Sequence, residues 1–171
     1  MSSLDYPRRQ HATGFRKSKE GDGIGADSFE LLLFRLGGDS AGERSELFGI
    51  NVSNLREIVA MPPMTAIAGA RAPVLGVVNL RGQIIRVLDL PAMGGCVPAT
   101  GLNIMLVTEA GEATQAFAVE AVEEIVVLGH ERLRKGEHGA GGGIISGIAR
   151  LDDGRLAQVL DIETILHQLR A

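Results

Sequence analysis

Short apolar runs alternate with polar and glycine-rich segments along most of the chain, from Phe29 to its end. Runs of this length that are rich in Val, Ile and Leu, and bounded by Gly, Asn, Asp or Pro, are typical of β-strands joined by turns. We therefore predict about eight to ten short strands. The clearest runs cover 29–36, 47–52, 74–80, 83–90, 103–109, 115–122, 123–128, 144–151 and 154–162. Their spacing is typical of barrels or sandwiches and argues against βαβ units, so the predicted fold class is mainly β.

The segment VLGVVNLRGQIIRVLDL (74–90) predicts a hairpin at the centre of the fold. Arg81-Gly82 separates its two strands, and Gly82 can adopt the positive φ that tight hairpin turns demand. Neither face of the second strand is cleanly polar, which predicts that it is covered on both sides over part of its length. Asp89, at the end of that strand, is expected to accept hydrogen bonds from backbone amides. The Asp-Gly pair at 153–154 predicts a second tight hairpin.

Apolar residues at helical spacing predict two short helices. The first is a turn or two of amphipathic helix over 55–59, capped by Ser53 or Asn54 and stopped by the two prolines that follow. The second spans 161–170, with an apolar face at positions i, i+3, i+4 and i+7 and Asp161 as its N-cap.

Composition narrows the classes of protein that remain. With 17 basic and 21 acidic residues, the net charge of −4 argues against a general nucleic-acid binder. No apolar run is long enough to span a membrane, and the N-terminus has no apolar signal region. Cys96 has no second cysteine to pair with, which favours a reducing compartment and hence the cytoplasm. Residues 1–27 carry scattered basic groups and few large apolar ones, and are expected to form a flexible basic arm.

No motif in the sequence indicates catalysis. The four histidines lack metal-ligand spacing, and the glycine run 139–143 lacks the Lys-Ser/Thr that a phosphate-binding loop requires. Glu120, Glu123 and Glu124 lie close together in sequence, which is typical of a solvated face. We therefore expect no enzyme activity, no metal and no cofactor.

Five segments, taken in order, carry a family resemblance. They are ELLLFRL (30–36), FGINVSNLREIV (48–59), VLGVVNLRGQIIRVLDL (74–90), AFAVEAVEEIVVL (116–128) and IISGIARLDDGRLAQVLDIETIL (144–166). Together they resemble the CheW family of bacterial chemotaxis coupling proteins, and some details are closest to the CheW-like module of CheV, which resembles CheW fused to a receiver domain. No receiver follows residue 171, so a coupling domain alone and a truncated product both stay open.

The resemblance implies a CheW-like fold. That fold has two small five-stranded SH3-like β-barrels, with a hydrophobic groove between them and a short C-terminal helix. It would occupy 28–171, with the first barrel at about 28–94 and the second at about 95–171, and with exchange of strands between them allowed.

The resemblance also implies a non-catalytic scaffold without a cofactor. One surface would grip the cytoplasmic tip of a methyl-accepting chemoreceptor, and another would pair with the regulatory domain of the histidine kinase CheA. The chain would then be cytoplasmic and held at membrane-bound receptor arrays through these partners, without membrane insertion and without nucleic acid.

By the family pattern, the partner surfaces draw on Leu55, Glu57, Gly76, Asn79 and Arg81. Arg81 lies at the hairpin tip, where its guanidinium can present five donors. Glu57 would be exposed on the short helix, although it and Arg81 could simply pair with each other. Leu55 is either an exposed apolar anchor or a core residue. Gly76 either admits a partner backbone or serves a β-bulge.

On this basis, Arg81→Ala or Glu57→Lys is predicted to change folding stability by only about 0.5 kcal/mol. The same changes are predicted to weaken partner binding by more than about 1 kcal/mol. Two other interpretations stay open at this point. One is a coupling module of another kinase cascade, such as twitching or development. The other is a small enzyme or ligand-binding barrel, which a deep apolar pocket ringed by titratable groups would indicate.

Overall fold

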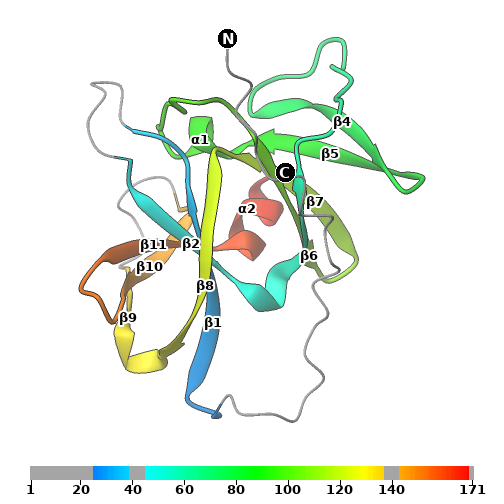
Figure 1. Ribbon diagram of the computed structural model, residues 1–171. Coiled ribbons are helices and arrows are strands. Elements are labelled where there is room, and N and C mark those ends of the chain that lie inside the picture. The colour runs from blue at the N-terminus through cyan, green and yellow to red at the C-terminus, as the bar shows by residue number, and fades with distance from the viewer. Residues whose placement is uncertain (1–24, 39–44, 137–142, 170–171) are drawn as a thin grey trace.

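The computed structural model describes residues 25–38, 45–136 and 143–169. Strands dominate this part of the chain, with two short α-helices and two 3-10 turns between them (Figure 1). In chain order the elements are β1 (Ser28–Arg35), β2 (Leu47–Asn51), η1 (Val52–Asn54), β3 (Leu55–Ala60), β4 (Val74–Leu80), β5 (Gln83–Asp89), α1 (Leu90–Met93), β6 (Ile104–Ala110), β7 (Ala113–Val119), β8 (Ala121–Gly129), η2 (His130–Arg132), β9 (Leu133–Lys135), β10 (Ile145–Arg150), β11 (Leu156–Leu160) and α2 (Ile162–Gln168).

The strands form two sheets. One has the order β8-β1-β2-β11-β10-β9 and the other the order β3-β6-β7-β5-β4. Most neighbours are antiparallel, and each sheet contains one parallel pair, β2 with β11 and β5 with β7. The predicted mainly β architecture with a short C-terminal helix is confirmed, and its strands form two sheets. The first sheet has a sixth strand because the polar segment LRK at 133–135 pairs with β10.

The six-stranded sheet takes strands from both of the approximate halves 28–94 and 95–171. β1 and β2 pair with strands from the C-terminal part of the chain, whereas β3 to β7 form the other sheet. The outer bounds of the domain, 28–171, stay a prediction. Most of the predicted arm, residues 1–24, lies outside the described residues.

Three clusters of buried side chains make the core. Phe29, Leu31 and Leu33 of β1 point into a cluster within the six-stranded sheet. A second cluster lies within the five-stranded sheet. The third joins residues of both sheets with helix α2, and it receives Leu32 and Phe34 from the opposite face of β1. β1 is apolar at successive positions because both of its faces are buried. The hydrophobic groove between barrels stays a prediction.

The predicted helix over 55–59 is wrong. Residues 55–60 form strand β3, which pairs with β6, and the 3-10 turn η1 precedes it. Asn51, rather than Ser53 or Asn54, caps that turn, because its side chain accepts a hydrogen bond from Ser53 N. Burial in β3 alternates at first, with Leu55 and Glu57 buried and Arg56 exposed. The β-branched pair Ile58-Val59 favours pairing with β6 over an isolated helical turn.

The predicted turn glycines and capping aspartates are confirmed. Gly82 and Gly154 have φ of 84° and 87°, as their tight turns require. Asp161 caps α2 by accepting from Thr164 N at 3.0 Å, and Asp89 caps α1 by accepting from Ala92 N at 3.1 Å. No helix within the described ranges has the length and apolarity needed to cross a membrane.

Candidate functional site

The β4–β5 hairpin extends to one side of the molecule and ends at Arg81-Gly82 (Figure 1). Arg81 itself has a φ of 51°, a conformation that non-glycine residues rarely adopt. Asn79 supports the turn, because its Oδ1 accepts a hydrogen bond from Gly82 N at 2.9 Å. The tip is therefore a defined turn that presents an arginine to solvent.

The guanidinium of Arg81 pairs with the carboxylate of Glu57 on β3. Its Nη1 lies 3.3 Å from both carboxylate oxygens, and its Nη2 contacts Oε2 as well. The Arg81 side chain is 64% exposed and that of Glu57 only 11% exposed. The expectation that Glu57 is free on a helix surface is thus wrong, because β3 turns it toward the hairpin. The alternative, in which the two residues pair with each other, is the arrangement observed.

Leu55 and Gly76 have interior roles. Leu55 is 2% exposed and packs in the core that the two sheets share, so it is not an exposed anchor. A Cβ on Gly76 would lie 2.4 Å from the carbonyl oxygen of Thr65. Thr65 and Val77 exchange two backbone hydrogen bonds of 2.9 Å, next to a register shift between Val74 and Gly76. The close approach at Gly76 is therefore made by this chain's own backbone, beside a bulge.

The structure adds residues that the sequence reasoning missed. Arg56 Nη1 donates to Gln83 Oε1 at 2.9 Å, and Arg56 Nε lies 3.6 Å from Glu109 Oε1. Ile84, next to Gln83, is 65% exposed. Interpreting 55–60 as a strand would have placed Arg56 on the opposite face from Leu55 and made it a candidate. The pairing with Gln83 has no signal in the sequence.

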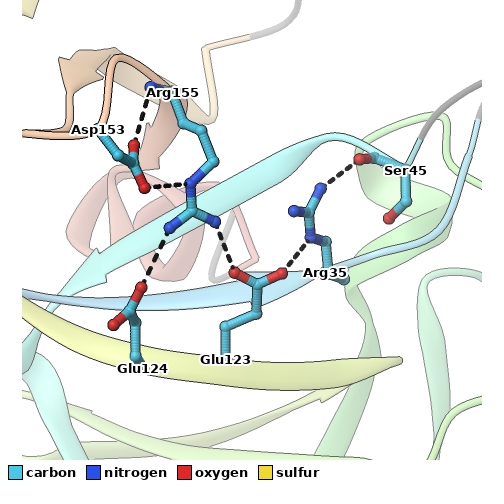
Figure 2. A network of polar contacts seen from close by, with 6 residues as sticks. All are labelled: Arg35, Ser45, Glu123, Glu124, Asp153 and Arg155. Carbon is cyan, nitrogen blue, oxygen red and sulfur yellow. Dashed lines mark hydrogen bonds and ion pairs between the residues drawn. The ribbon is translucent and has the colours of Figure 1, made fainter.

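A second polar cluster lies on the six-stranded sheet (Figure 2). Glu123 of β8 accepts from Arg35 Nε at 2.7 Å and from Arg155 Nη1 at 3.0 Å. Arg155, in the β10–β11 turn, also contacts Glu124 at 3.1 Å and Asp153 at 2.7 Å. Arg35 Nη1 in addition donates to the carbonyl oxygen of Ser45.

Glu123 and Glu124 are exposed, as expected for a solvated face, and they also form ion pairs. Glu123 and Glu124 tie β8 to β1 and to the β10–β11 turn. Glu120 accepts a hydrogen bond from Ala99 N at 2.8 Å.

The charges of this cluster shift one another's pKa. Partial burial raises the pKa of Glu123, but hydrogen bonds and charges from Arg35 and Arg155 outweigh it, so the pKa lies below its usual value. Hydrogen bonds from the Arg155 backbone and side chain lower the pKa of Asp153. The pKa of Arg155 is raised by hydrogen bonds to Asp153 and Glu123. Each of these three shifts favours the ionised form of its group.

A projecting hairpin with an oriented guanidinium and an exposed aliphatic neighbour is suited to recognising another protein. The fold is thus two β-sheets with a shared core, one of which carries the projecting hairpin. A model of the CheW-like domain matches residues 30–170. The chain therefore belongs to the CheW-like domain family, and the predicted resemblance is confirmed.

Individual relatives agree with this family. The probable chemotaxis protein CheW of Rhizobium etli is 33% identical over 104 residues, which are 60% of this chain and 63% of that protein. The chemotaxis protein CheV3 of Helicobacter pylori is 27% identical over 160 residues, which are 89% of this chain and 51% of that protein. The matched part of this chain thus spans less than two thirds of either relative.

A solved structure has the same fold. The crystal structure of the scaffolding protein TtCheW from Thermoanaerobacter tengcongensis superposes with a TM-score of 0.69 at 22% sequence identity. The superposition covers 78% of this chain and 89% of that chain. The mainly β, CheW-like fold class is therefore confirmed.

Proposed function

We propose that this chain is a non-catalytic adaptor of a bacterial chemotaxis pathway, which couples chemoreceptors to the histidine kinase CheA. The observation that carries the proposal is the match of the CheW-like domain over residues 30–170. Relatives named as chemotaxis proteins CheW and CheV3 support the same pathway. The chain would act in the cytoplasm, at receptor arrays that it reaches through its partners.

For the kinase, we propose docking of its regulatory domain at the tip of the β4–β5 hairpin. Glu57 holds the Arg81 guanidinium in one orientation while most of that side chain stays exposed. A charged group whose position is fixed before binding loses little entropy on docking. Ile84 adds exposed apolar area next to the arginine. Asn79 would act by shaping the turn, and Leu55 and Gly76 by supporting the strands behind it.

For the receptor, we propose a separate contact with the cytoplasmic tip of a methyl-accepting chemoreceptor. An adaptor must hold both partners at once, so the two surfaces cannot coincide. β8 offers exposed aliphatic side chains, Ile125 and Val127, on the other sheet from the hairpin. Such side chains are suited to packing against a helical tip.

Binding of the isolated kinase regulatory domain, measured by titration calorimetry, tests the hairpin contact. Arg81→Ala is expected to weaken this binding by more than about 1 kcal/mol, or roughly fivefold. Arg132→Ala is the matched control, since Arg132 is also ion-paired, at 3.4 Å to Asp152, but lies in η2, between β8 and β9 of the six-stranded sheet. Equal affinities for wild type and Arg81→Ala, with both folded, would show that the hairpin tip is not the kinase surface.

A further inference from the structure

The outer half of the β4–β5 hairpin extends past the residues at which β5 pairs with β7. β4 and β5 pair with each other from Val74 and Leu88 out to Leu80 and Gln83. β5 pairs with β7, however, only at 87–89, among the described residues. On the other side of the hairpin, the backbone of Thr65 reaches β4 at Val77. A two-stranded ribbon is marginally stable without further support.

Where the backbone pairing of β5 with β7 ends, the side chain of Gln115 of β7 continues the hydrogen bonding to β5. Val87 is paired with Ala116, so Gln115 lies level with the first residue of β5 that has no backbone partner on β7. The Gln115 side-chain amide donates to the carbonyl oxygen of Arg86 at 2.6 Å and to that of Ala116 at 3.0 Å. In return, its Oε1 accepts from Arg86 Nε and Nη2 at 3.4 and 3.3 Å.

Burial makes this bridge costly to break. Gln115 is 3% exposed, and every polar atom of its side chain is used by the contacts to Arg86 and Ala116. A buried amide or carbonyl without a hydrogen-bond partner is strongly unfavourable. The outer half of the hairpin therefore cannot swing away from β7 without leaving such groups unpaired.

Val78 and Ile85 of the hairpin are buried in an apolar cluster with residues of β6 and β7. Further polar ties to the body come from β3. Glu57 holds Arg81, and Arg56 holds Gln83 at 2.9 Å. Within the described chain, no backbone hydrogen bond joins β3 to β4 or β5. Polar side chains of β3 and β7 thus add directional contacts to this apolar packing, and Gln115 is the most buried of them.

We propose that Gln115 is a positioning residue, which holds the outer half of the β4–β5 hairpin, and with it the Arg81 tip, in the orientation used for docking. Arg86 is its counterpart on the hairpin. The claim about orientation concerns the free chain, and the claim about docking rests on the kinase contact proposed above. A tip that is oriented before binding associates without first being ordered, so loosening it lowers affinity.

Amide hydrogen exchange of the free chain tests the first claim. Gln115→Leu keeps the size of the side chain and removes its hydrogen bonds. We expect the amides of 78–86 to exchange about tenfold faster in this variant, while the rest of the five-stranded sheet is unchanged. Gln158→Leu is the matched control, since Gln158 bonds Glu46 on the other sheet, and it should leave the hairpin unchanged.

Arg86→Ala is a second variant, which tests the same bridge if Gln115→Leu does not fold. It removes an exposed side chain and keeps the hydrogen bond from Gln115 to the Arg86 carbonyl. We therefore expect the amides of 78–86 to exchange faster than in wild type, but by a smaller factor than in Gln115→Leu. Unchanged exchange in the hairpin, or a uniform rise over both sheets, in Gln115→Leu would overturn the positioning role.

Binding of the kinase regulatory domain tests the second claim. Gln115→Leu should weaken binding at least threefold although it leaves the tip residues in place, and Gln158→Leu should not. Faster hairpin exchange with unchanged affinity would overturn the claim that orientation matters for docking. If wild type fails to bind the domain, the proposed kinase contact is wrong, and the exchange data still decide the positioning role.

Discussion

The Glu57 side chain is almost fully buried, and the positive charge of Arg81 balances its negative charge. The pair differs from an ordinary surface ion pair, because one partner is 11% exposed and the other 64% exposed. Removing the arginine leaves the Glu57 carboxylate without a cation in a poorly hydrated site. In an ion pair with two exposed partners, removing one leaves the other fully hydrated, which costs little. Substitutions of the two residues are therefore expected to change stability by different amounts.

This asymmetry revises the stability predicted for substitutions at the tip. Glu57→Lys puts a second cation in a buried site and should cost more than about 2 kcal/mol of unfolding free energy. Arg81→Ala should cost about 1 kcal/mol, since solvent screens part of the pair. Denaturant unfolding measures both. Arg132→Ala, whose partner Asp152 is 82% exposed, should change stability by less than about 0.5 kcal/mol. A cost for Glu57→Lys as small as that of Arg132→Ala would contradict the burial of Glu57.

At the scale of elements, the cluster around Glu123 ties β8 to β1 and to the β10–β11 turn (Figure 2). The pKa of Glu123 is below its ordinary value, so the folded state binds a proton there less readily than the unfolded chain does. The stability that Glu123 contributes is therefore fully present above the ordinary carboxyl pKa. It is lost as the pH falls through the lowered, folded-state pKa.

Glu123→Gln should accordingly reduce stability at neutral pH and have a diminishing effect in acid. The expected curve for wild type falls below about pH 4.5, and that of the variant falls less steeply. Thermal unfolding between pH 3 and 7 measures both curves. Glu163→Gln, at an exposed position on α2, is the control. Parallel curves for wild type and Glu123→Gln would exclude the ionised cluster as a source of stability.

The sequence predicts an element well when its pattern of apolar and turn residues fits only one kind of secondary structure. β1 is apolar at the successive positions 31–34 because both faces are buried there, and the turns at Gly82 and Gly154 need a positive φ. The sequence of β3 predicts a helix because its apolar residues also fit helical spacing, and the ion pair of Glu57 has no local signal because Arg81 lies far along the chain. β9 is polar and becomes a strand through its pairing with β10. Gln115 carries no local signal, because its role depends on where the β5–β7 ladder stops.

At the scale of the whole molecule, the two sheets are one folding unit. The largest buried cluster takes Phe34 and Phe48 from one sheet, Leu106 and Phe117 from the other, and part of α2. Strands from both ends of the chain form the six-stranded sheet, so neither half of the sequence holds a complete sheet. The surfaces proposed for kinase and receptor are thus carried on one rigid body.

Phe117→Ala should therefore weaken both sheets together. Phe117 is 1% exposed in the shared core, so its truncation is expected to cost about 3–5 kcal/mol. Hydrogen exchange should rise in the core strands of both sheets by a similar factor. Ile84→Ala, at a 65% exposed position, should leave exchange in both sheets unchanged. Faster exchange in the five-stranded sheet alone would mean that the sheets unfold independently.

Co-sedimentation of CheA with receptor-containing membranes tests the adaptor role most directly, because it requires both contacts at once. The kinase alone should stay mainly in the supernatant, and adding this chain should carry it into the pellet. Arg81→Ala should sediment with the receptors itself but carry less kinase with it, and Arg132→Ala should match wild type. Sedimentation of the kinase to the same extent with and without the chain would contradict the proposed coupling function.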